Sequence, residues 1–253
     1  MSGKVFIVGA GPGDPRLITL KGLECIRAAD VIVYDRLVHP SLLEEAPPGT
    51  EQIYAGKEAS HHTLPQDRIN ELLAMHAAAG KTVVRLKGGD PMVLGRGGEE
   101  AAFLADREIP FEIVPGVTSA IAVPAFAGIP VTYRGVSSSF AVATGHECGL
   151  DPAPDYAALF RSAGTLVILM GVKNLPKIVA QMLLAGIDPE TPLAAIEEGT
   201  RDTQRTFVTT LHGILKDGFD LKAPAVIVVG NVVLLRDRLQ WFREATQFSP
   251  VHS

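Results

Sequence analysis

Short apolar runs alternate along this chain with segments whose apolar residues recur every three or four positions. The runs are rich in valine and isoleucine and are bounded by glycine or proline, as expected of strands buried in a parallel sheet. Strands are predicted at 5–8, 31–34, 82–86, 111–114, 140–144, 165–170, 193–197 and 225–230. The periodic segments at 67–80, 99–108 and 174–186 predict helices, two of which should end at Gly80 and Gly186. This alternation predicts an α/β fold.

The pattern is interrupted near its middle by a segment rich in proline, glycine and serine, GIPVTYRGVSS at 128–138. We place a domain boundary there. It gives an N-terminal α/β domain over 1–133, a C-terminal α/β domain over 134–246 and a tail over 247–253. A chain of 253 residues is long enough for two domains that each bury a core.

Composition narrows the range of partners. The formal net charge is −5 and no run of lysine or arginine stands out, so no nucleic-acid partner is expected. No stretch reaches the roughly 18 apolar residues of a membrane span, and the first residues lack the pattern of a signal peptide. Cys25 and Cys148 indicate neither a disulfide framework nor a zinc site, and the adjacent His61 and His62 lack a third ligand at a useful spacing. We therefore expect a cytoplasmic protein with no bound metal and no membrane partner.

The turn VGAGPGDP at 8–15 is the first candidate for ligand binding, because it joins a strand to the helical pattern DPRLITLKGLECI. Gly9 and Gly11 match two glycines of the dinucleotide-binding fingerprint, but Asp14 stands where the third should be. Asp14 followed by Pro15 is typical of a helix N-cap, and its carboxylate would occupy the N–H groups that a pyrophosphate needs. The turn therefore suits either a ligand without phosphate or no ligand at all.

Glycines and small polar residues also follow several other predicted strands. In an open α/β sheet, ligands bind beyond the carboxyl ends of the strands. The loops concerned begin at Asp35, Gly88, Pro115, Gly171 and Glu198. We expect these five loops at one edge, where they would line a cleft, although each could be an ordinary turn.

Several longer motifs resemble the tetrapyrrole methylase family. They are VGAGPGDPRLITLKG (8–22), VIVYDRLV (31–38), AGKEASHHTLPQDRIN (55–70), VVRLKGGDPMVLGRGGEE (83–100), PGVTSAIAVPAFAGIPVTYRG (115–135) and PAVIVVGNVV (224–233). Their order extends the resemblance from residue 4 to about residue 243. Leu94 departs from it, since members of this family often carry an aromatic residue at that position.

The resemblance implies two α/β domains with S-adenosylmethionine (SAM) in the ligand cleft between them, a homodimer, and a small-molecule tetrapyrrole as the second substrate. The segment GKEASHHTLPQ further implies methylation of uroporphyrinogen III at C2 and C7. The product would be precorrin-2, the branch point to sirohaem and cobalamin, with S-adenosylhomocysteine (SAH) as the second product. A methylase of a later corrin precursor is the alternative. SAM carries no phosphate, in agreement with the capped turn.

The site residues implied by the resemblance fall into three groups. Asp35 would be the catalytic base and Lys57 the proton donor. Substrate carboxylates would be bound by Arg36, Arg96 and Arg134, each of which could instead form a surface ion pair. Contacts with SAM would come from Pro12, Gly88, Gly89, Asp90, Val93, Thr118, Ser119, Met170, Gly199 and Ala225.

Two other classes of protein give these residues different roles. In an NAD(P)-binding oxidoreductase with a degenerate turn, Asp35 would bind a ribose. As a separate alternative, Lys57 could be a solvated surface charge, like most lysines. A SAM-binding regulator without catalytic activity is the other class. It would bind SAM and yield no methylated product.

Overall fold

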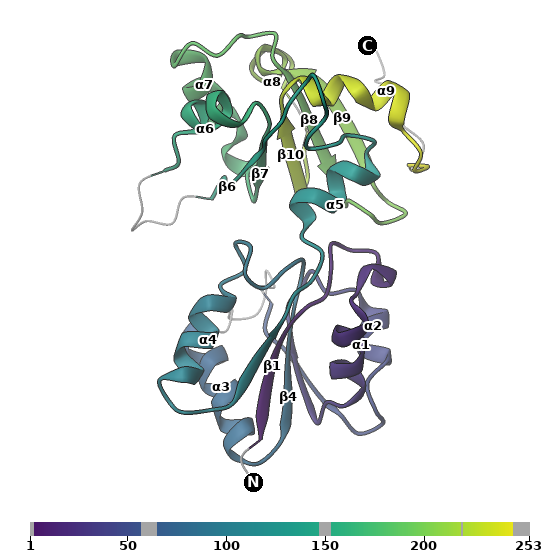
Figure 1. Cartoon of the computed structure of the whole chain (residues 1–253), viewed down its shortest axis with the longest axis vertical. Helices are drawn as coiled ribbons and strands as arrows, with labels where there is room; N and C mark the ends of the chain where they lie inside the picture. Colours follow the sequence, from purple (N-terminus) through teal and green to yellow (C-terminus); the bar gives the residue numbers. More distant parts are fainter. Residues whose placement is uncertain (1–2, 57–64, 147–152, 219, 245–253) are drawn as a thin grey trace. The chain divides into compact units, whose positions relative to one another are not determined.

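The computed structural model describes residues 3–56, 65–146, 153–218 and 220–244. The chain divides into two compact units, the first of which ends at Thr118 and the second of which begins at Ser119. Within the described residues, each unit contains a five-stranded sheet that is covered by helices on both faces (Figure 1). This arrangement confirms the predicted α/β fold. None of the helices in these ranges is long and apolar enough to cross a bilayer.

The sheet of the first unit is parallel throughout, with the strand order β3-β2-β4-β1-β5. Its strands are β1 (Lys4–Gly9), β2 (Val31–Tyr34), β3 (Glu51–Tyr54), β4 (Thr82–Lys87) and β5 (Phe111–Val114). Helices α3 (Gln66–Ala78) and α4 (Gly97–Ala105) pack on one face, and α1 (Leu20–Arg27) and α2 (Pro40–Glu44) pack on the other. Because both faces are covered, the central strands β1, β2 and β4 are largely buried and most of their residues are apolar.

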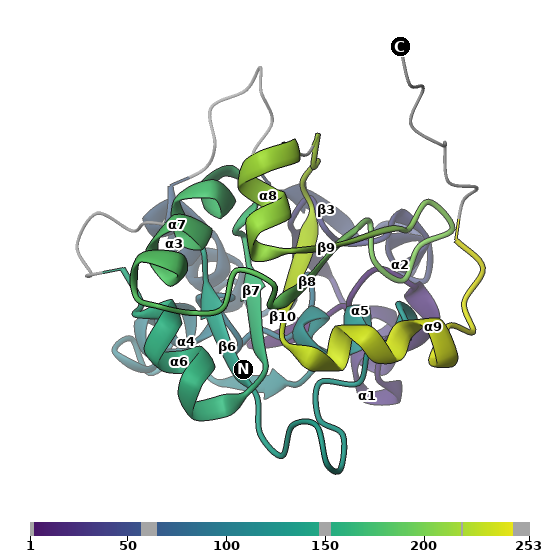
Figure 2. The ribbon, with the colours of Figure 1, turned by 90° about the horizontal axis from the view of Figure 1, so that it is seen from above.

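The sheet of the second unit is mixed, with the strand order β6-β7-β10-β8-β9. Its strands are β6 (Ala141–Thr144), β7 (Leu166–Leu169), β8 (Pro192–Glu197), β9 (Arg205–Thr210) and β10 (Ala225–Val229). Helices α6 (Tyr156–Ala163), α7 (Leu175–Leu184) and α8 (Leu211–Asp217) pack on one face (Figure 2). The other face is covered by α5 (Ser119–Phe126) and the 3₁₀ helix η3 (Asn231–Leu235). The short η2 (Val172–Asn174) precedes α7, and α9 (Arg236–Leu239) follows η3.

The prediction of parallel strands is wrong for this second sheet. β6 and β7 are parallel, but the other three neighbouring pairs are antiparallel. A strand that is covered on both faces is apolar along its length in either kind of sheet, so the sequence pattern did not reveal its direction.

All the predicted strands are present, with ends that differ by one residue at most. Two strands were not predicted, β3 and β9. Both are edge strands with charged or polar residues, EQIY and RTFVTT, and both are partly exposed. An apolar run identifies a buried strand but does not detect an edge of this kind.

The helix predicted to begin at Pro15 is divided in two. Asp14 caps only the 3₁₀ helix η1 (Pro15–Leu17), and α1 begins at Leu20 with Thr19 as its own cap. Two N-cap residues lie close together in the sequence, and each begins a separate helical segment. Asp14 is therefore confirmed as a cap, although not of the long helix.

The boundary between the units lies earlier in the chain than residue 133. Helix α5 belongs to the second unit because Ala120 and Val123 pack into the core formed by β7, β8 and β10. The segment 128–138 instead connects α5 to β6 inside that unit.

Candidate active site

Loops leave the carboxyl edge of the first sheet after β1, β2, β4 and β5, and the backbones of three of them touch. Gly11 and Gly89 exchange two backbone hydrogen bonds, of 3.2 Å from the Gly11 N–H and 2.6 Å from the Gly89 N–H. A Cβ on Gly9 would lie 2.5 Å from the nitrogen of Gly116 and 2.7 Å from the oxygen of Gly89. Glycine is thus required at Gly9 for the loops to pack against one another, a role that does not depend on a ligand.

Asp90 joins two of these loops through its side chain. One carboxylate oxygen accepts the N–H of Gly116 at 3.0 Å, and the other accepts the N–H of Met92 at 2.8 Å. The half-buried Val93 follows in the same loop. Asp90 therefore shapes the loop in which several of the predicted SAM contacts lie.

The turn after β1 carries its own counter-charge. Asp14 accepts the backbone N–H of Arg16 at 2.9 Å and pairs with the Arg16 guanidinium at 2.6 Å. The side-chain hydrogen bond from Arg16 lowers the pKa of Asp14, whose residue is 8% exposed. A nearly buried negative charge at this position opposes a pyrophosphate. The half-buried Pro12 lies two residues before Asp14 in the same turn.

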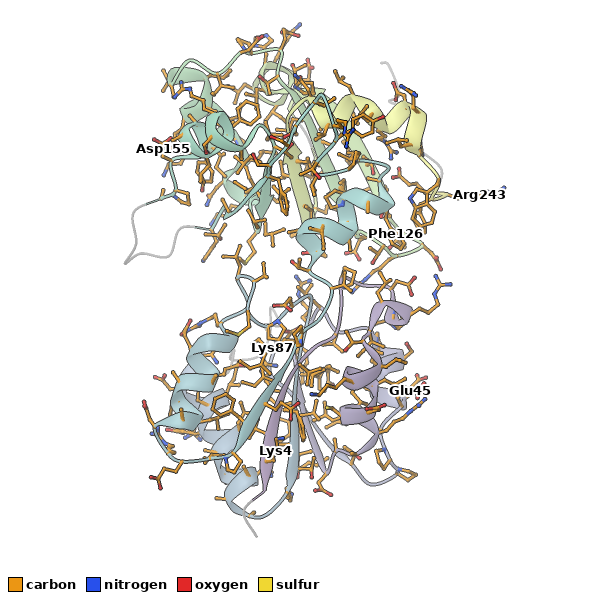
Figure 3. The ribbon with its side chains drawn as sticks, in the orientation of Figure 1. Lys4, Glu45, Lys87, Phe126, Asp155 and Arg243 are labelled. Carbon is orange, nitrogen blue, oxygen red and sulfur yellow. The ribbon has the colours of Figure 1, made fainter. Side chains whose placement is uncertain are left out.

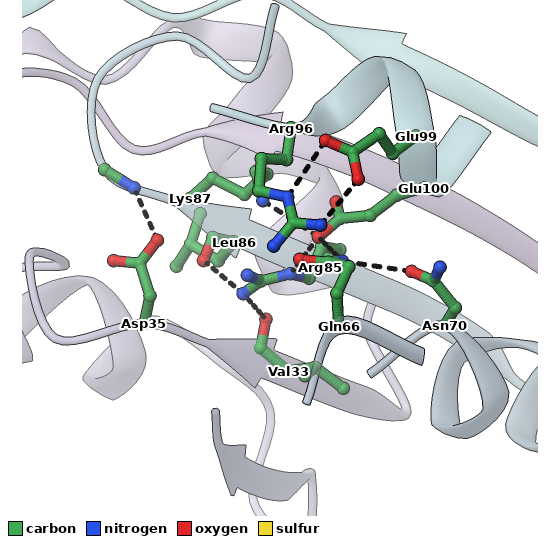
Figure 4. Close-up of polar contacts among 11 residues, drawn as sticks. Val33, Asp35, Gln66, Asn70, Arg85, Leu86, Lys87, Arg96, Glu99 and Glu100 are labelled. Carbon is green, nitrogen blue, oxygen red and sulfur yellow. Dashed lines mark hydrogen bonds and ion pairs between the residues drawn. The ribbon is translucent and has the colours of Figure 1, made fainter. Parts of the chain in front are cut away.

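Asp35, the predicted base, follows the last residue of β2 and is half-buried. One carboxylate oxygen accepts the N–H of Leu37 at 3.0 Å. The other accepts the N–H of Gly88 at 3.2 Å (Figure 4). The predicted base is therefore in direct contact with one of the predicted SAM-binding residues. Lys57, the predicted proton donor, lies outside the described residues.

A cluster of buried charges lies next to this edge. Glu100 accepts hydrogen bonds at one oxygen from Lys87 at 2.9 Å, Arg85 at 3.1 Å and Gln66 at 3.1 Å (Figure 4). Arg85, Lys87 and Glu100 are 3%, 4% and 0% exposed. Burial, and then the charge of Arg85, lowers the pKa of Lys87. The second oxygen of Glu100 has no hydrogen-bond partner among the described residues.

Sequence analysis missed this cluster, although a signal was present. Arg85 and Lys87 are two positions apart in an otherwise apolar strand, so both point to the same face of the sheet. Figure 3 shows Lys87 near the carboxyl end of β4. A buried cation needs a counter-charge. The sequence did not reveal whether Glu99 or Glu100 supplies it, since the two are adjacent.

The three arginines predicted to bind substrate are all exposed. Arg36 and Arg96 lie in loops that follow the neighbouring strands β2 and β4, whereas Arg134 belongs to the second unit. Arg96 forms a two-pronged ion pair with Glu99, at 2.9 and 2.6 Å, and the side-chain hydrogen bond from Arg96 lowers the pKa of Glu99. The guanidinium of Arg96 thus already has the geometry that binds a carboxylate.

The other predicted SAM contacts of the second unit lie at one edge of its sheet. Met170 follows β7, Gly199 lies in the loop after β8, and Ala225 begins β10. Because β10 is antiparallel to both neighbours, Ala225 pairs with Glu197 at the end of β8. The antiparallel direction that the sequence did not reveal is what brings Ala225 to this edge. The five loops expected at one edge are therefore divided, with three at the first sheet and two at the second.

Left-handed backbone is concentrated in the same loops. The non-glycine residues with positive φ in the described ranges are Leu94, Arg96, Glu108, Met170, Glu198 and Thr200. Leu94, Arg96, Glu198 and Thr200 lie in strand-end loops that the sequence identified as candidate ligand sites, and Met170 directly precedes another such loop. Such backbone costs on the order of 1–3 kcal/mol per residue and often occurs at functional sites. Thr118 and Ser119, both half-buried, lie where the first unit meets the second in sequence.

Comparisons with known proteins agree with the motifs. Residues 4–214 match the family model for Tetrapyrrole (Corrin/Porphyrin) Methylases. The chain is 51% identical to the S-adenosyl-L-methionine-dependent uroporphyrinogen III methyltransferase of Methanosarcina barkeri, over 97% of this chain and 98% of that protein. It is 44% identical to the siroheme synthase of Thioalkalivibrio sulfidiphilus over 96% of this chain, but it spans only 50% of the length of that protein.

A solved structure extends the comparison to the fold. The uroporphyrin-III C-methyl transferase of Thermus thermophilus, complexed with S-adenyl homocysteine, matches with a TM-score of 0.80 and 41% identity, over 91% of this chain and 93% of that one. The family model covers most of the chain, and the identity with the M. barkeri protein extends over nearly all of it. This chain therefore belongs to the tetrapyrrole methylase family.

Proposed function

We propose that this chain transfers methyl groups from SAM to C2 and C7 of uroporphyrinogen III, with precorrin-2 and SAH as products. The observation that carries this proposal is the 51% identity with the M. barkeri methyltransferase over 97% of the chain. The T. thermophilus relative that was solved with SAH supports SAM as the methyl donor.

The reaction requires a substrate carbon aligned behind the sulfonium methyl group and a base that removes a proton from the pyrrole as that carbon attacks. Positioning of this kind lowers a barrier by up to about 7–11 kcal/mol. We assign the base to Asp35, whose carboxylate is held in one orientation by two backbone N–H groups at the strand-end edge. We assign the proton donor to Lys57, on the match of its motif to the family.

The proposed SAM contacts fit a ligand that has no phosphate. The turn after β1 already holds the Asp14 carboxylate, and backbone groups and small side chains predominate in the other loops. In the first unit we assign SAM contacts to Pro12, Gly88, Gly89, Asp90, Val93 and Thr118. In the second unit we assign them to Ser119, Met170, Gly199 and Ala225.

Uroporphyrinogen III is a polycarboxylate, so its binding site requires cations. We assign this role to Arg36, Arg96 and Arg134. Arg96 is the strongest of the three candidates, because its fork already binds the carboxylate of Glu99 and can exchange that partner for one on the substrate.

We further propose that the enzyme is cytoplasmic. We also propose that it works as a homodimer, as the resemblance to the family implies. Light scattering on the purified full chain tests the dimer. A monomer mass at micromolar concentration would refute it.

One assay tests the function. The protein is incubated anaerobically with SAM and freshly generated uroporphyrinogen III, and the tetrapyrroles are analysed by mass spectrometry. We expect products that carry one and then two added methyl groups, together with SAH. A later-acting methylase would leave uroporphyrinogen III unchanged, and a SAM-binding regulator would bind SAM without forming SAH. An oxidoreductase would bind a nicotinamide cofactor instead of SAM.

A further inference from the structure

A glutamate that follows α9 is buried and makes several polar contacts. Glu244 belongs to no helix or strand, yet its side chain is only 5% exposed. Its carboxylate accepts hydrogen bonds from Gln204 at 3.0 Å, from the N–H and hydroxyl of Thr206 at 3.2 and 2.5 Å, and from Arg236 at 3.0 Å. Glu244 is therefore fixed to the strand β9 and to the loop that precedes it.

Gln204 connects Glu244 to a second loop. Gln204 is 0% exposed, and its amide NH₂ donates to Glu244 while its carbonyl oxygen accepts the N–H of Thr200 at 2.7 Å. Thr200 has a φ of 68°, a left-handed conformation that a non-glycine residue keeps only when its surroundings hold it. An amide is well suited to this position, because it offers an acceptor at one atom and a donor at the other.

The loop held in this way contains Gly199. Glu198 before it also has a positive φ, of 46°. On its other side, a Cβ on Gly199 would overlap the side chain of Val123 in α5. The loop is thus fixed between α5 and Gln204, and a shift of Gln204 moves the backbone next to Gly199.

We propose that Gln204 and Glu244 are positioning residues for SAM, which act by holding the Gly199 loop in its binding conformation. The inference rests on the proposed contact between Gly199 and SAM. When a loop is already ordered before the ligand binds, less of the binding free energy is lost to ordering that loop. Gln204 and Glu244 therefore contribute to SAM affinity without contacting the ligand.

The test uses the full chain and SAH as the probe, with Kd measured by calorimetry. Gln204→Glu keeps an acceptor for Thr200 but places two carboxylates against each other. We expect its Kd for SAH to rise about tenfold, the effect of one lost buried hydrogen bond. The double variant Gln204→Glu with Glu244→Gln restores a donor–acceptor pair and should return Kd to within about threefold of the wild type.

A purely structural role predicts a different result. If these residues only stabilise the fold, the variant has a lower Tm and a smaller folded fraction, and hence a lower apparent kcat. The molecules that remain folded then bind SAH with the normal Kd. The matched control is Trp241→Phe. Trp241 lies close to Glu244 in the sequence, and the change removes the hydrogen bond that its indole N–H donates to the backbone oxygen of Ala125 in α5. It should lower Tm and leave Kd unchanged. If Gln204→Glu and the control both lower Tm with no change in Kd, the proposal is wrong.

Gly199→Ala separates this proposal from the site assignment on which it rests. If Gly199→Ala weakens SAH binding and Gln204→Glu does not, the positioning role fails while the site stands. If neither changes Kd, the assignment of Gly199 fails and the inference fails with it. A wild-type protein that does not bind SAH at all would refute the proposed function itself. Should Gln204→Glu not fold, Glu244→Gln is used, with an expected rise in Kd of about threefold.

Discussion

Replacement of Glu100 by glutamine tests whether the buried charge cluster governs the stability of the first unit. Glu100 is fully buried and lies between two buried cations, Lys87 and Arg85. Glutamine has nearly the same volume and keeps one carbonyl oxygen as an acceptor. The variant therefore removes the negative charge while changing the packing very little.

The structure sets the size of the effect. Removal of one partner from a buried ion pair typically costs about 3–5 kcal/mol, because the remaining charge is left without compensation. Here two cations lose the same partner, so we expect a cost near the upper end of that range. Whole proteins are typically stable by only about 5–15 kcal/mol, so the variant should unfold at clearly lower urea concentration.

The adjacent Glu99 provides a matched control. It pairs with Arg96 at the surface, where the two side chains are 56% and 55% exposed, so Glu99→Gln should cost no more than about 1 kcal/mol. Urea unfolding of both variants, followed by circular dichroism, gives the comparison. Equal costs for Glu99→Gln and Glu100→Gln would refute the reasoning. Addition of Lys87→Met to Glu100→Gln removes one uncompensated cation and should recover part of the loss.

The loss of stability caused by Glu100→Gln should also depend on pH. Burial lowers the pKa of Lys87, so between the lowered pKa and the ordinary lysine value the unfolded chain binds more protons than the folded one. Stability therefore rises with pH across that window. Loss of the Glu100 charge lowers the pKa of Lys87 further and widens the window. The cost of Glu100→Gln should consequently shrink as the pH rises toward the ordinary pKa of lysine, about 10.4.

Five further variants test the site and the fold. Asp35→Asn should lower kcat by roughly 10²–10⁴-fold with little change in the Kd for SAH, and near-normal turnover would remove Asp35 from the role of base. Arg96→Ala should raise the KM for the tetrapyrrole about tenfold, and an unchanged KM would exclude it as a substrate ligand. Gly116→Ala should cost about 1–3 kcal/mol in urea unfolding, because its Cβ would overlap backbone atoms. Gly98→Ala, whose Cβ meets only a side-chain atom at 3.8 Å, should change stability by less than about 1 kcal/mol. Hydrogen bonds from two lysines hold the pKa of Glu112 at about 2, so the stability lost in Glu112→Gln should be present above about pH 4.5 and vanish toward pH 2.

The central strands could be predicted from the sequence, because burial on both faces requires an apolar run whatever the neighbouring strands are. Their directions could not be predicted. β10 shows the consequence, since only its antiparallel pairing with β7 and β8 places Ala225 beside the loop that contains Gly199. The edge strands β3 and β9 were missed because a partly exposed strand does not need an apolar run.

The sequence by itself determined the buried strands, the cap at Asp14 and the family, since these depend on local conformation, on burial within a few residues, and on motifs of fixed spacing. Only the tertiary structure decided that Gly9, Gly89 and Gly116 pack together and that Glu100 rather than Glu99 meets the buried cations. It also decided that Glu244 supports a loop some forty residues away in the chain. These contacts join segments that are distant in sequence, and they form only where packing of the sheets and helices brings those segments together.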